Sequence, residues 1–373
     1  MLIESLRLRD FRNAADLRLV PGQRINLLVG RNAQGKTNII EAIGLLSTGQ
    51  SFRAPDFRDM IRWDREAAEV SARAICAAGS DELKINIDVR RKLFTRNEKR
   101  VTSKAPSNFF TVLFAPEEIL LLKGPPAGRR RYIDSLIFQL SQPHRNHAMQ
   151  YDKVMRQRNR LLQDIRLSES ARTTGLRPWD EQLAELGSRI IVARNDWCGR
   201  INSLLPDRYR SIAPEEGYAR FAYAPHCGQR ALEKGLEGVM ERLREQLEER
   251  RKDELVRGVS LVGPHRDDLE AEIGPSRVKH FGSQGQHRSF VLALKIAEMD
   301  LLREAAGGEE PILLLDDVAS ELDPERNRYF FEGLRAARGQ VFITATSEAD
   351  IKLPAGSEMT IFHVAQGMAT PRK

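Results

Sequence analysis

The chain opens with apolar and polar residues in the alternation that is typical of β-strands. Apolar side chains stand at Ile3, Leu6 and Leu8, and an apolar run over residues 25–29 leads into a glycine-rich segment. Such patterns predict strands with a buried face. Residues 84–89 alternate strictly and residues 96–99 form a plausible turn, so the sequence predicts a surface β-hairpin in this segment.

After Gly124 the pattern changes to polar stretches with helical spacing, interrupted by prolines at 178, 206, 214 and 225. The longest of these helices would span only ~39 Å, too short for a long coiled-coil arm. Apolar runs typical of strands return later in the chain. The predicted helices cover residues 130–140, 143–167, 180–205 and 229–251, and the later strands cover 341–346 and 359–364.

These patterns predict an α/β fold in two units, since 373 residues exceed the size of one typical domain. We expect residues 1–124 and 255–373 to form one split unit, and residues 125–254 to form a mostly helical inserted domain. The three cysteines show no metal-ligand or redox spacing. The chain has no apolar run long enough for a membrane span or a signal peptide, so we expect a cytoplasmic protein without membrane partners.

The glycine-rich segment has the pattern G-x-x-x-x-G-K-T between a strand and a helix, the context of a phosphate-binding loop. Backbone N–H groups of residues 32–37 would face the phosphates, Lys36 would reach the β- and γ-phosphates, and Thr37 would ligate Mg²⁺. A chance glycine loop before a helix is the alternative, and the full context disfavours it. The expected nucleotide-binding residues are Gly30, Arg31, Asn32, Ala33, Gln34, Gly35, Lys36, Thr37 and Asn38.

A second acidic half of the site is expected far along the chain, where four apolar residues at 312–315 precede Asp316 and Asp317. A buried strand would deliver Asp316 to Mg²⁺, and Asp317 would orient or deprotonate the attacking water. With Lys36, these two acids are the candidate catalytic residues. An ordinary strand end with solvated carboxylates is the alternative.

A helix start is expected at Ser283, Gln284, Gly285 and Gln286, about thirty residues before the acidic strand. Helix N-termini attract anions, although a serine cap on a structural helix is the commoner reason for such a match. ABC-type ATPases place their signature motif and acidic strand in this order.

Basic residues concentrate in two places, against a formal net charge of +7. Residues 84–104 hold eight basic and two acidic side chains, and three arginines follow one another at the start of a predicted helix, where they oppose the helix dipole. A solvated charged turn is the alternative for the arginine triplet. The candidate DNA-binding residues are Arg90, Arg91, Lys92, Arg96, Lys99, Arg100, Arg129, Arg130 and Arg131.

The motifs over residues 30–38, 283–286 and 315–323 together resemble the SMC-like branch of the ABC ATPases. More narrowly, the chain is similar to the RecF family of bacterial recombination-repair proteins, with further support from residues 11–13, 112–134 and 263–268. The resemblance implies a split ABC/SMC-type P-loop ATPase head. It also implies that ATP is enclosed between two protomers, with the segment Ser283–Gln286 acting in trans.

The same resemblance places Arg12 and Asn13 near the nucleotide, and Ser320 and Asp323 in a loop that crosses the dimer interface. Asp317 stands where transporters carry glutamate, which implies slow hydrolysis. The switch histidine of transporters is replaced by Thr344 or Thr346, and the glutamine expected between the lobes is replaced by Glu117 or Glu118.

By resemblance, the function is a weak DNA-dependent ATPase of recombinational repair with ATP and Mg²⁺ as cofactors. An ATP-dependent homodimer would clamp double-stranded DNA near gap junctions and help to load RecA together with RecO and RecR, and hydrolysis would release it. The alternatives are the nucleotide-binding subunit of a transporter and a small-molecule kinase with a self-contained site.

Overall fold

The computed structural model describes residues 1–54, 56–77, 79–101, 109–115, 118, 121–167, 173–317, 339–351 and 358–372. The chain forms two compact units. The head unit comprises residues 1–120, 211–214 and 284–373, and the inserted unit comprises residues 121–210 and 215–283. The predicted insertion is present, but the head resumes at residue 284, not at residue 255 as the sequence suggested.

An antiparallel sheet of six strands forms one part of the head unit, in the order β2-β1-β4-β5-β6-β7. Its strands alternate buried and exposed side chains, as expected for a sheet with one face in a core. The predicted hairpin is confirmed, because β6 and β7 pair across a turn in which Asn97 and Glu98 both have positive φ. The strands are Leu2–Phe11 (β1), Ala14–Leu19 (β2), Ala67–Cys76 (β4), Gly79–Asp88 (β5), Lys92–Arg96 (β6) and Lys99–Arg100 (β7).

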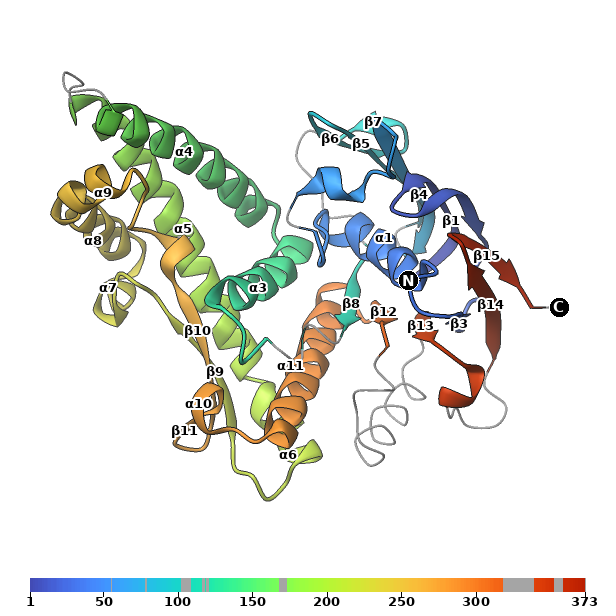
Figure 1. The fold of residues 1–373 in the computed structure, drawn as a ribbon. Helices are drawn as coiled ribbons and strands as arrows, with labels where there is room; N and C mark the ends of the chain where they lie inside the picture. Colours follow the sequence, from blue (N-terminus) through green and yellow to red (C-terminus); the bar gives the residue numbers. More distant parts are fainter. Residues whose placement is uncertain are drawn as a thin grey trace. The chain divides into compact units, whose positions relative to one another are not determined.

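The second sheet of the head unit has the order β15-β14-β3-β13-β12-β8, and all its pairs are parallel except β14 with β15. Its central strand β3 lies between β13 and β14, which come from the end of the chain (Figure 1). The apolar runs predicted as strands are therefore confirmed. The strands are Ile25–Val29 (β3), Thr111–Phe114 (β8), Ile312–Leu315 (β12), Val341–Ala345 (β13), Met359–Ala365 (β14) and Met368–Pro371 (β15).

Helix α1 (Lys36–Thr48) belongs to the core that joins the two sheets. Ile39, Ile40 and Ile43 are fully buried in one cluster with side chains from both sheets. A helix that is apolar on most sides is buried on most sides. The phosphate loop therefore leads into a helix held by packing along its length. The head unit also contains η1 (Phe57–Met60), α11 (Gln284–Ala305) and η5 (Glu348–Asp350).

The inserted unit is mostly helical, as predicted. The stretch predicted as one helix over 229–251 is divided at Lys234, which lies between α7 and α8, and Gly235 at the start of α8 has φ 74°. Its helices are Pro126–Leu140 (α3), Gln142–Leu167 (α4), Thr173–Leu176 (η2), Arg177–Asn202 (α5), Leu205–Ile212 (α6, whose last two residues belong to the head unit), Gln229–Glu233 (α7), Gly235–Glu249 (α8), Arg251–Arg257 (α9), Pro264–Arg266 (η3) and Val278–Phe281 (α10).

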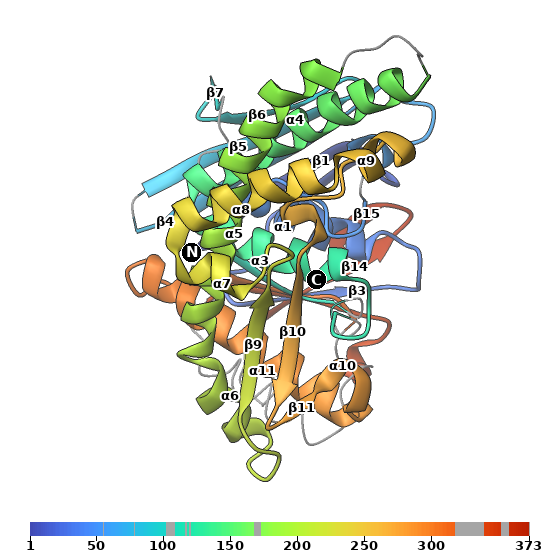
Figure 2. The same cartoon turned by 90° about the vertical axis from the view of Figure 1, so that its left-hand side faces the viewer.

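A small sheet explains why the boundary of the insertion lies later than expected. Strand β9 (Ala219–Ala224) pairs antiparallel with β10 (Asp268–Ile273), and β10 pairs with the short β11 (Ser276–Arg277). Figure 2 shows β9 and β10 side by side. Because β9 lies within the insertion, its partner strand belongs there too. Strand β9 was not predicted from the sequence, although its two large apolar residues, Phe221 and Tyr223, stand two positions apart as on one face of a strand.

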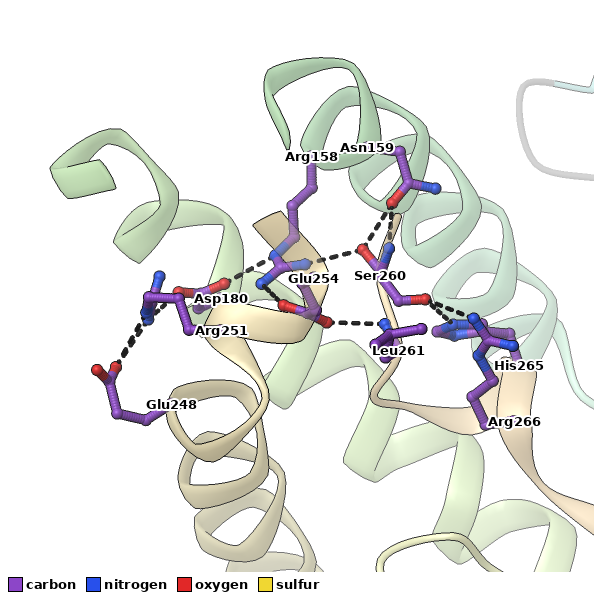
Figure 3. Close-up of polar contacts among 10 residues, drawn as sticks. All are labelled: Arg158, Asn159, Asp180, Glu248, Arg251, Glu254, Ser260, Leu261, His265 and Arg266. Carbon is purple, nitrogen blue, oxygen red and sulfur yellow. Dashed lines mark hydrogen bonds and ion pairs between the residues drawn. The ribbon is translucent and has the colours of Figure 1, made fainter. Parts of the chain in front are cut away.

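A buried polar cluster ties the helices of the inserted unit together (Figure 3). The Arg158 side chain is fully buried and donates to Asp180 at 2.8 Å, Glu254 at 2.6 Å and Ser260 at 2.9 Å. Arg251 adds a second cation on Asp180. This Arg158 cluster joins α4, α5 and α9, so its charges are matched inside the fold.

Candidate nucleotide site

The phosphate loop follows β3 and ends at Gly35, which is the N-cap of α1 and has φ 112°. This backbone conformation favours glycine, and a Cβ at this position would lie 2.8 Å from the Asn13 side-chain oxygen. The turn between β14 and β15 supports the loop from outside, because the backbone N–H groups of Gln366 and Gly367 donate to Gln34. The loop is therefore held by residues from near both ends of the chain, Asn13 on one side and Gln366 and Gly367 on the other.

The Lys36 ammonium lies inside the loop, and the residue is only 7% exposed. Its Nζ donates to the carbonyl oxygens of Gly30 at 2.6 Å and Arg31 at 3.1 Å. Burial lowers the pKa of Lys36, and the nearby carboxylates of Asp317 and Asp316 oppose that shift. An ammonium held in this way is placed to bind an anion at the loop.

The two halves of the predicted site meet at the carboxyl edge of the parallel sheet. Strand β13 lies between β3 and β12, so the loop after β3 and the acids after β12 share one edge. The Thr37 hydroxyl donates to Asp316 Oδ1 at 3.0 Å. Two oxygen ligands at this spacing suit Mg²⁺, which prefers hydroxyl and carboxylate oxygens.

Thr344 on β13 bonds to both acids of the pair Asp316 and Asp317. The sequence alone did not decide between Thr344 and Thr346 for the position of the switch histidine. The Thr344 hydroxyl donates to Asp316 Oδ1 at 2.8 Å and accepts from the backbone N–H of Asp317 at 2.9 Å. Asp317 has φ 51°, so this bond helps to hold an unusual backbone conformation. Thr346 instead donates to Asp350 at 2.7 Å, outside the acidic pair.

Asn13 and Asn38 connect the first hairpin to the phosphate loop. Asn13 Nδ2 donates to the carbonyl oxygen of Gln34 at 3.1 Å, and Asn38 Nδ2 donates to Asn13 Oδ1 at 2.7 Å. Both asparagines therefore lie at the phosphate loop.

Arg12 is oriented by a buried carboxylate that the sequence analysis missed. Its guanidinium makes a bidentate ion pair with Glu41, at 2.6 and 2.9 Å, and Glu41 on α1 is fully buried. The Ser51 hydroxyl also donates to Glu41. A bidentate pair of this kind fixes the orientation of an arginine. The signal in the sequence was an acidic residue, Glu41, inside the apolar stretch at 39–46.

The predicted signature segment lies at the start of α11, which begins at Gln284. Ser283 and Gln284 are exposed, whereas Gly285 and Gln286 are partly buried. Farther along α11, the buried Lys295 pairs with Glu118 at 2.8 Å and Glu298 at 3.0 Å. Ser320 and Asp323 of the predicted interface loop, and Glu117, lie outside the described residues.

The basic hairpin, which lies within residues 84–104, has fewer unpaired positive charges than its sequence suggested. Several of its basic side chains form ion pairs within the antiparallel sheet. Lys84 pairs with Glu69 at 2.8 Å, Arg96 with Asp81 at 2.6 Å, and Arg91 with Asp88 at 3.4 Å. Lys92 donates to the Gly49 carbonyl oxygen at 2.7 Å, and burial lowers its pKa to about 8. Among the described residues, the candidates exposed and without an ion pair on this hairpin are Arg90, Lys99 and Arg100.

The arginine triplet of α3 requires a correction. Arg129 is 1% exposed and pairs with Asp268 at 2.7 Å, while it also donates to the carbonyl oxygens of Leu121 and Gly124. Arg130 donates to the Asp267 carbonyl oxygen. The unfavourable position at a helix start is therefore compensated inside the unit, and Arg129 is not available to DNA. Arg131 alone of the three is exposed.

Two negative findings apply to the described part of the chain. It contains no group of three or more His, Cys, Asp or Glu residues that could hold a metal ion. Nor does any described helix combine the length and the apolar character that crossing a membrane requires. The ring nitrogens of His265 contact the Tyr151 hydroxyl and the Ser260 carbonyl oxygen, so this histidine is engaged within the fold.

Comparison with known proteins relates the whole chain to one family. Residues 2–370 match the model of the RecF/RecN/SMC N terminal domain. The DNA replication and repair protein RecF of Geotalea uraniireducens (strain Rf4) is 37% identical over 370 residues, which cover 98% of this chain and 99% of that protein. RecF of Geobacter sulfurreducens is 36% identical over 375 residues, covering 100% of both chains.

Solved structures agree with this relationship. A structure of the recombination mediator protein RecF with ATP, in the RecFOR pathway, has a TM-score of 0.87 and 31% identity, and the match covers 100% of this chain and 97% of that one. An SMC head bound to the C-winged helix domain of ScpA has a TM-score of 0.51 at 16% identity, which supports the fold alone. The expectation of a split ATPase head with an insertion is thus confirmed.

Proposed function

The chain belongs to the RecF family, and on that premise we propose that it is an ATP-dependent DNA-binding protein of recombinational repair with slow ATPase activity. The observation that carries the proposal is the contact between Thr37 and Asp316, which unites the two halves of a nucleotide site from opposite ends of the chain. Lys36 then binds the β- and γ-phosphates, as in other phosphate loops.

Thr37 and Asp316 are the residues that would hold Mg²⁺, which neutralises phosphate charge when bound. Asp317 is exposed at the sheet edge and is placed to orient or deprotonate a water molecule. Its side chain is one methylene shorter than the glutamate of transporters, which supports slow turnover.

The exposed start of α11 supports a composite site. We expect Ser283 to Gln286 of one protomer to close over ATP bound by the other, with Ser320 and Asp323 at the interface. ATP then joins a dimer that clamps double-stranded DNA near gaps. Relatives in the RecFOR pathway support RecO and RecR as partners in RecA loading. We assign direct DNA contacts to the exposed Arg90, Lys99, Arg100 and Arg131, whose phosphate contacts make binding salt-dependent.

Two inactive variants provide the test, because their defects fall on different protomers of a composite site. Lys36→Ala removes phosphate binding, and Ser283→Arg blocks the exposed signature start. Each alone should reduce ATP turnover by about a hundredfold or more. In a mixture, one site of each heterodimer combines an intact loop with an intact signature, so part of the activity should return.

Turnover is measured against total protein concentration, with and without duplex DNA. Wild type should show a steeper-than-linear rise that DNA enhances. A mixture that stays inactive, while each variant remains folded by circular dichroism, contradicts the composite site. Linear turnover that ignores DNA contradicts the DNA-dependent dimer.

A further inference from the structure

A groove of about 610 Å³ crosses the antiparallel sheet of the head unit. It extends over four neighbouring strands, β2, β1, β4 and β5. Its polar lining comes from side chains that alternate with the buried Leu6, Leu8 and Val70. The groove shares no residue with the nucleotide site or with the proposed DNA contacts. It is therefore a surface feature that the proposed function does not use.

Strand pairing gathers three arginines and two serines at this groove. Arg7 on β1 is the register partner of Arg18 on β2 and of Ser71 on β4. Arg73 on β4 is the register partner of Ser5 on β1. Side chains of directly opposite residues lie on the same face of a sheet, so the three guanidinium groups and the two hydroxyls belong to one surface. All five residues line the groove.

The carboxylates beside these arginines do not match them one for one. Asp16 accepts from Arg7 at 2.9 and 3.0 Å and also lies 3.5 Å from Arg18, while Glu4 lies 2.9 Å from Arg73. The side chains of Arg18 and Arg73 remain 69% and 58% exposed. Because exposed ion pairs contribute little to stability, the carboxylates of a partner can replace them or add to them at small cost.

Other groups at the groove favour a peptide over a nucleic acid as its occupant. Glu82 lines the groove and is exposed, so its carboxylate would repel a phosphate but would accept from a peptide N–H. Val20 also lines the groove with 73% of its surface exposed. An apolar side chain of a peptide would bury this surface, whereas a phosphate backbone would not. The groove thus combines cations, a hydrogen-bond acceptor and an apolar contact.

The dimensions of the groove suit a short extended segment. Neighbouring strands lie about 4.8 Å apart, so four strands span about 14 Å. An extended peptide rises about 3.3 Å per residue, so about four or five residues cross the groove. Guanidinium groups bind carboxylates through two parallel hydrogen bonds, which makes arginine selective for acidic side chains. A segment of this length that carries acidic residues therefore matches the arginines.

We propose that this groove docks a short acidic segment of a partner protein. The carboxylates of the segment pair with Arg7, Arg18 and Arg73, and an apolar residue beside them contacts Val20. The inference goes beyond the proposed function, because it gives the head unit a protein-docking surface that is separate from the nucleotide site and from the DNA contacts.

Fluorescence anisotropy tests the groove with three labelled probes: a short peptide of glutamates that ends in leucine, the matching peptide of lysines, and a short DNA duplex. Wild type should bind the glutamate peptide and not the lysine peptide. The double variant Arg18→Glu with Arg73→Glu should weaken binding of the glutamate peptide about tenfold or more, because bonds to charged groups are lost. Its DNA affinity and ATP turnover should equal those of wild type.

Arg90→Glu is the matched control, because Arg90 is an exposed arginine that follows β5 outside the groove. It should weaken DNA binding and leave binding of the glutamate peptide unchanged. The neutral double variant Arg18→Gln with Arg73→Gln should lose less peptide affinity than the charge reversal, and circular dichroism should show that both double variants are folded.

Failure of wild type to bind the glutamate peptide overturns the docking groove, and so does binding that survives both double variants. Equal binding of the glutamate and lysine peptides also overturns it, because the arginines would then not select the ligand. If the charge reversal weakens DNA and peptide binding together, the groove is a nucleic-acid surface and the proposal fails. ATP turnover of wild type is measured separately, so none of these outcomes by itself contradicts the proposed function.

Discussion

The polar residues of the nucleotide site and those of the Arg158 cluster differ in how their charges are matched. Arg158 has no exposed surface, and two carboxylates and a hydroxyl surround it. Lys36 is held mainly by backbone carbonyl oxygens, and the acid beside it, Asp317, is exposed. Internal side-chain pairing marks a structural cluster, whereas charges gathered at an open edge mark a site for a ligand.

The largest expected effect is a loss of folding stability when the Arg158 cluster is broken. Arg158→Ala leaves Asp180 and Glu254 buried without their shared cation, which should lower the free energy of unfolding by about 3–5 kcal/mol. Urea denaturation measures it. The control is Arg242→Ala, since Arg242 also faces two carboxylates, Glu245 and Glu249, but at the surface. That variant should lose at most about 1 kcal/mol.

ATP binding by folded Arg158→Ala should equal that of wild type. Impaired ATP binding without a loss of stability would contradict the distinction between a structural cluster and a ligand site.

The next largest effect is a pH dependence of folding stability that arises from His265 in the inserted unit. Burial lowers the pKa of His265 from its ordinary 6.5 to about 4, and its neutral ring accepts from Tyr151 and donates to the Ser260 carbonyl oxygen. Between these pH values the unfolded chain binds the extra proton, so stability is present above pH 6.5 and declines as the pH falls towards 4. The decline should reach about 3 kcal/mol at pH 4.

The contribution of His265 is isolated by comparing wild type with His265→Gln, which cannot titrate. The difference in unfolding free energy between the two proteins should change across pH 4 to 6.5 and remain constant from pH 7 to 8. A constant difference over the whole range would show that His265 has an ordinary pKa.

The smallest effect concerns the support of the acidic pair. Thr344→Val keeps the shape of a buried side chain but removes the hydroxyl that bonds to Asp316 and Asp317. A hydrogen bond to a charged group contributes about 1.5–3 kcal/mol, so ATP turnover should fall about tenfold to a hundredfold. The matched control is Thr346→Val, which removes a bond to Asp350 alone and should leave turnover unchanged. Equal turnover in both variants would show that the Thr344 hydroxyl does not contribute to the function of the acidic pair.

Sequence patterns predicted the local features of this protein well. The phosphate loop, the acidic strand and the hairpin turn at Asn97 each depend on neighbouring residues, and each forms where expected. The division into two units was also predicted, although β9 went unnoticed in a helical region. Because β9 pairs with β10, the inserted unit ends at residue 283, whereas the sequence had suggested residue 254.

The predictions that failed concerned basic side chains whose ion-pair partners lie far away in the sequence. Eight basic residues in one segment suggested a cationic surface, but Glu69 and Asp81 on neighbouring strands compensate two of them. Arg129 appeared to need an external anion, yet Asp268 supplies the carboxylate. Pairings of this kind span many residues of sequence, so local composition cannot reveal them.

The position of β3 in the parallel sheet has a consequence for synthesis on the ribosome. This strand is made early, but both of its neighbours, β13 and β14, are made last. At about 5–20 residues per second, the roughly 300 residues that separate them require about 15–60 s. During that interval the strand that will carry the phosphate loop has neither of its final partners, so a nascent chain cannot bind ATP through a finished site before its last strands emerge.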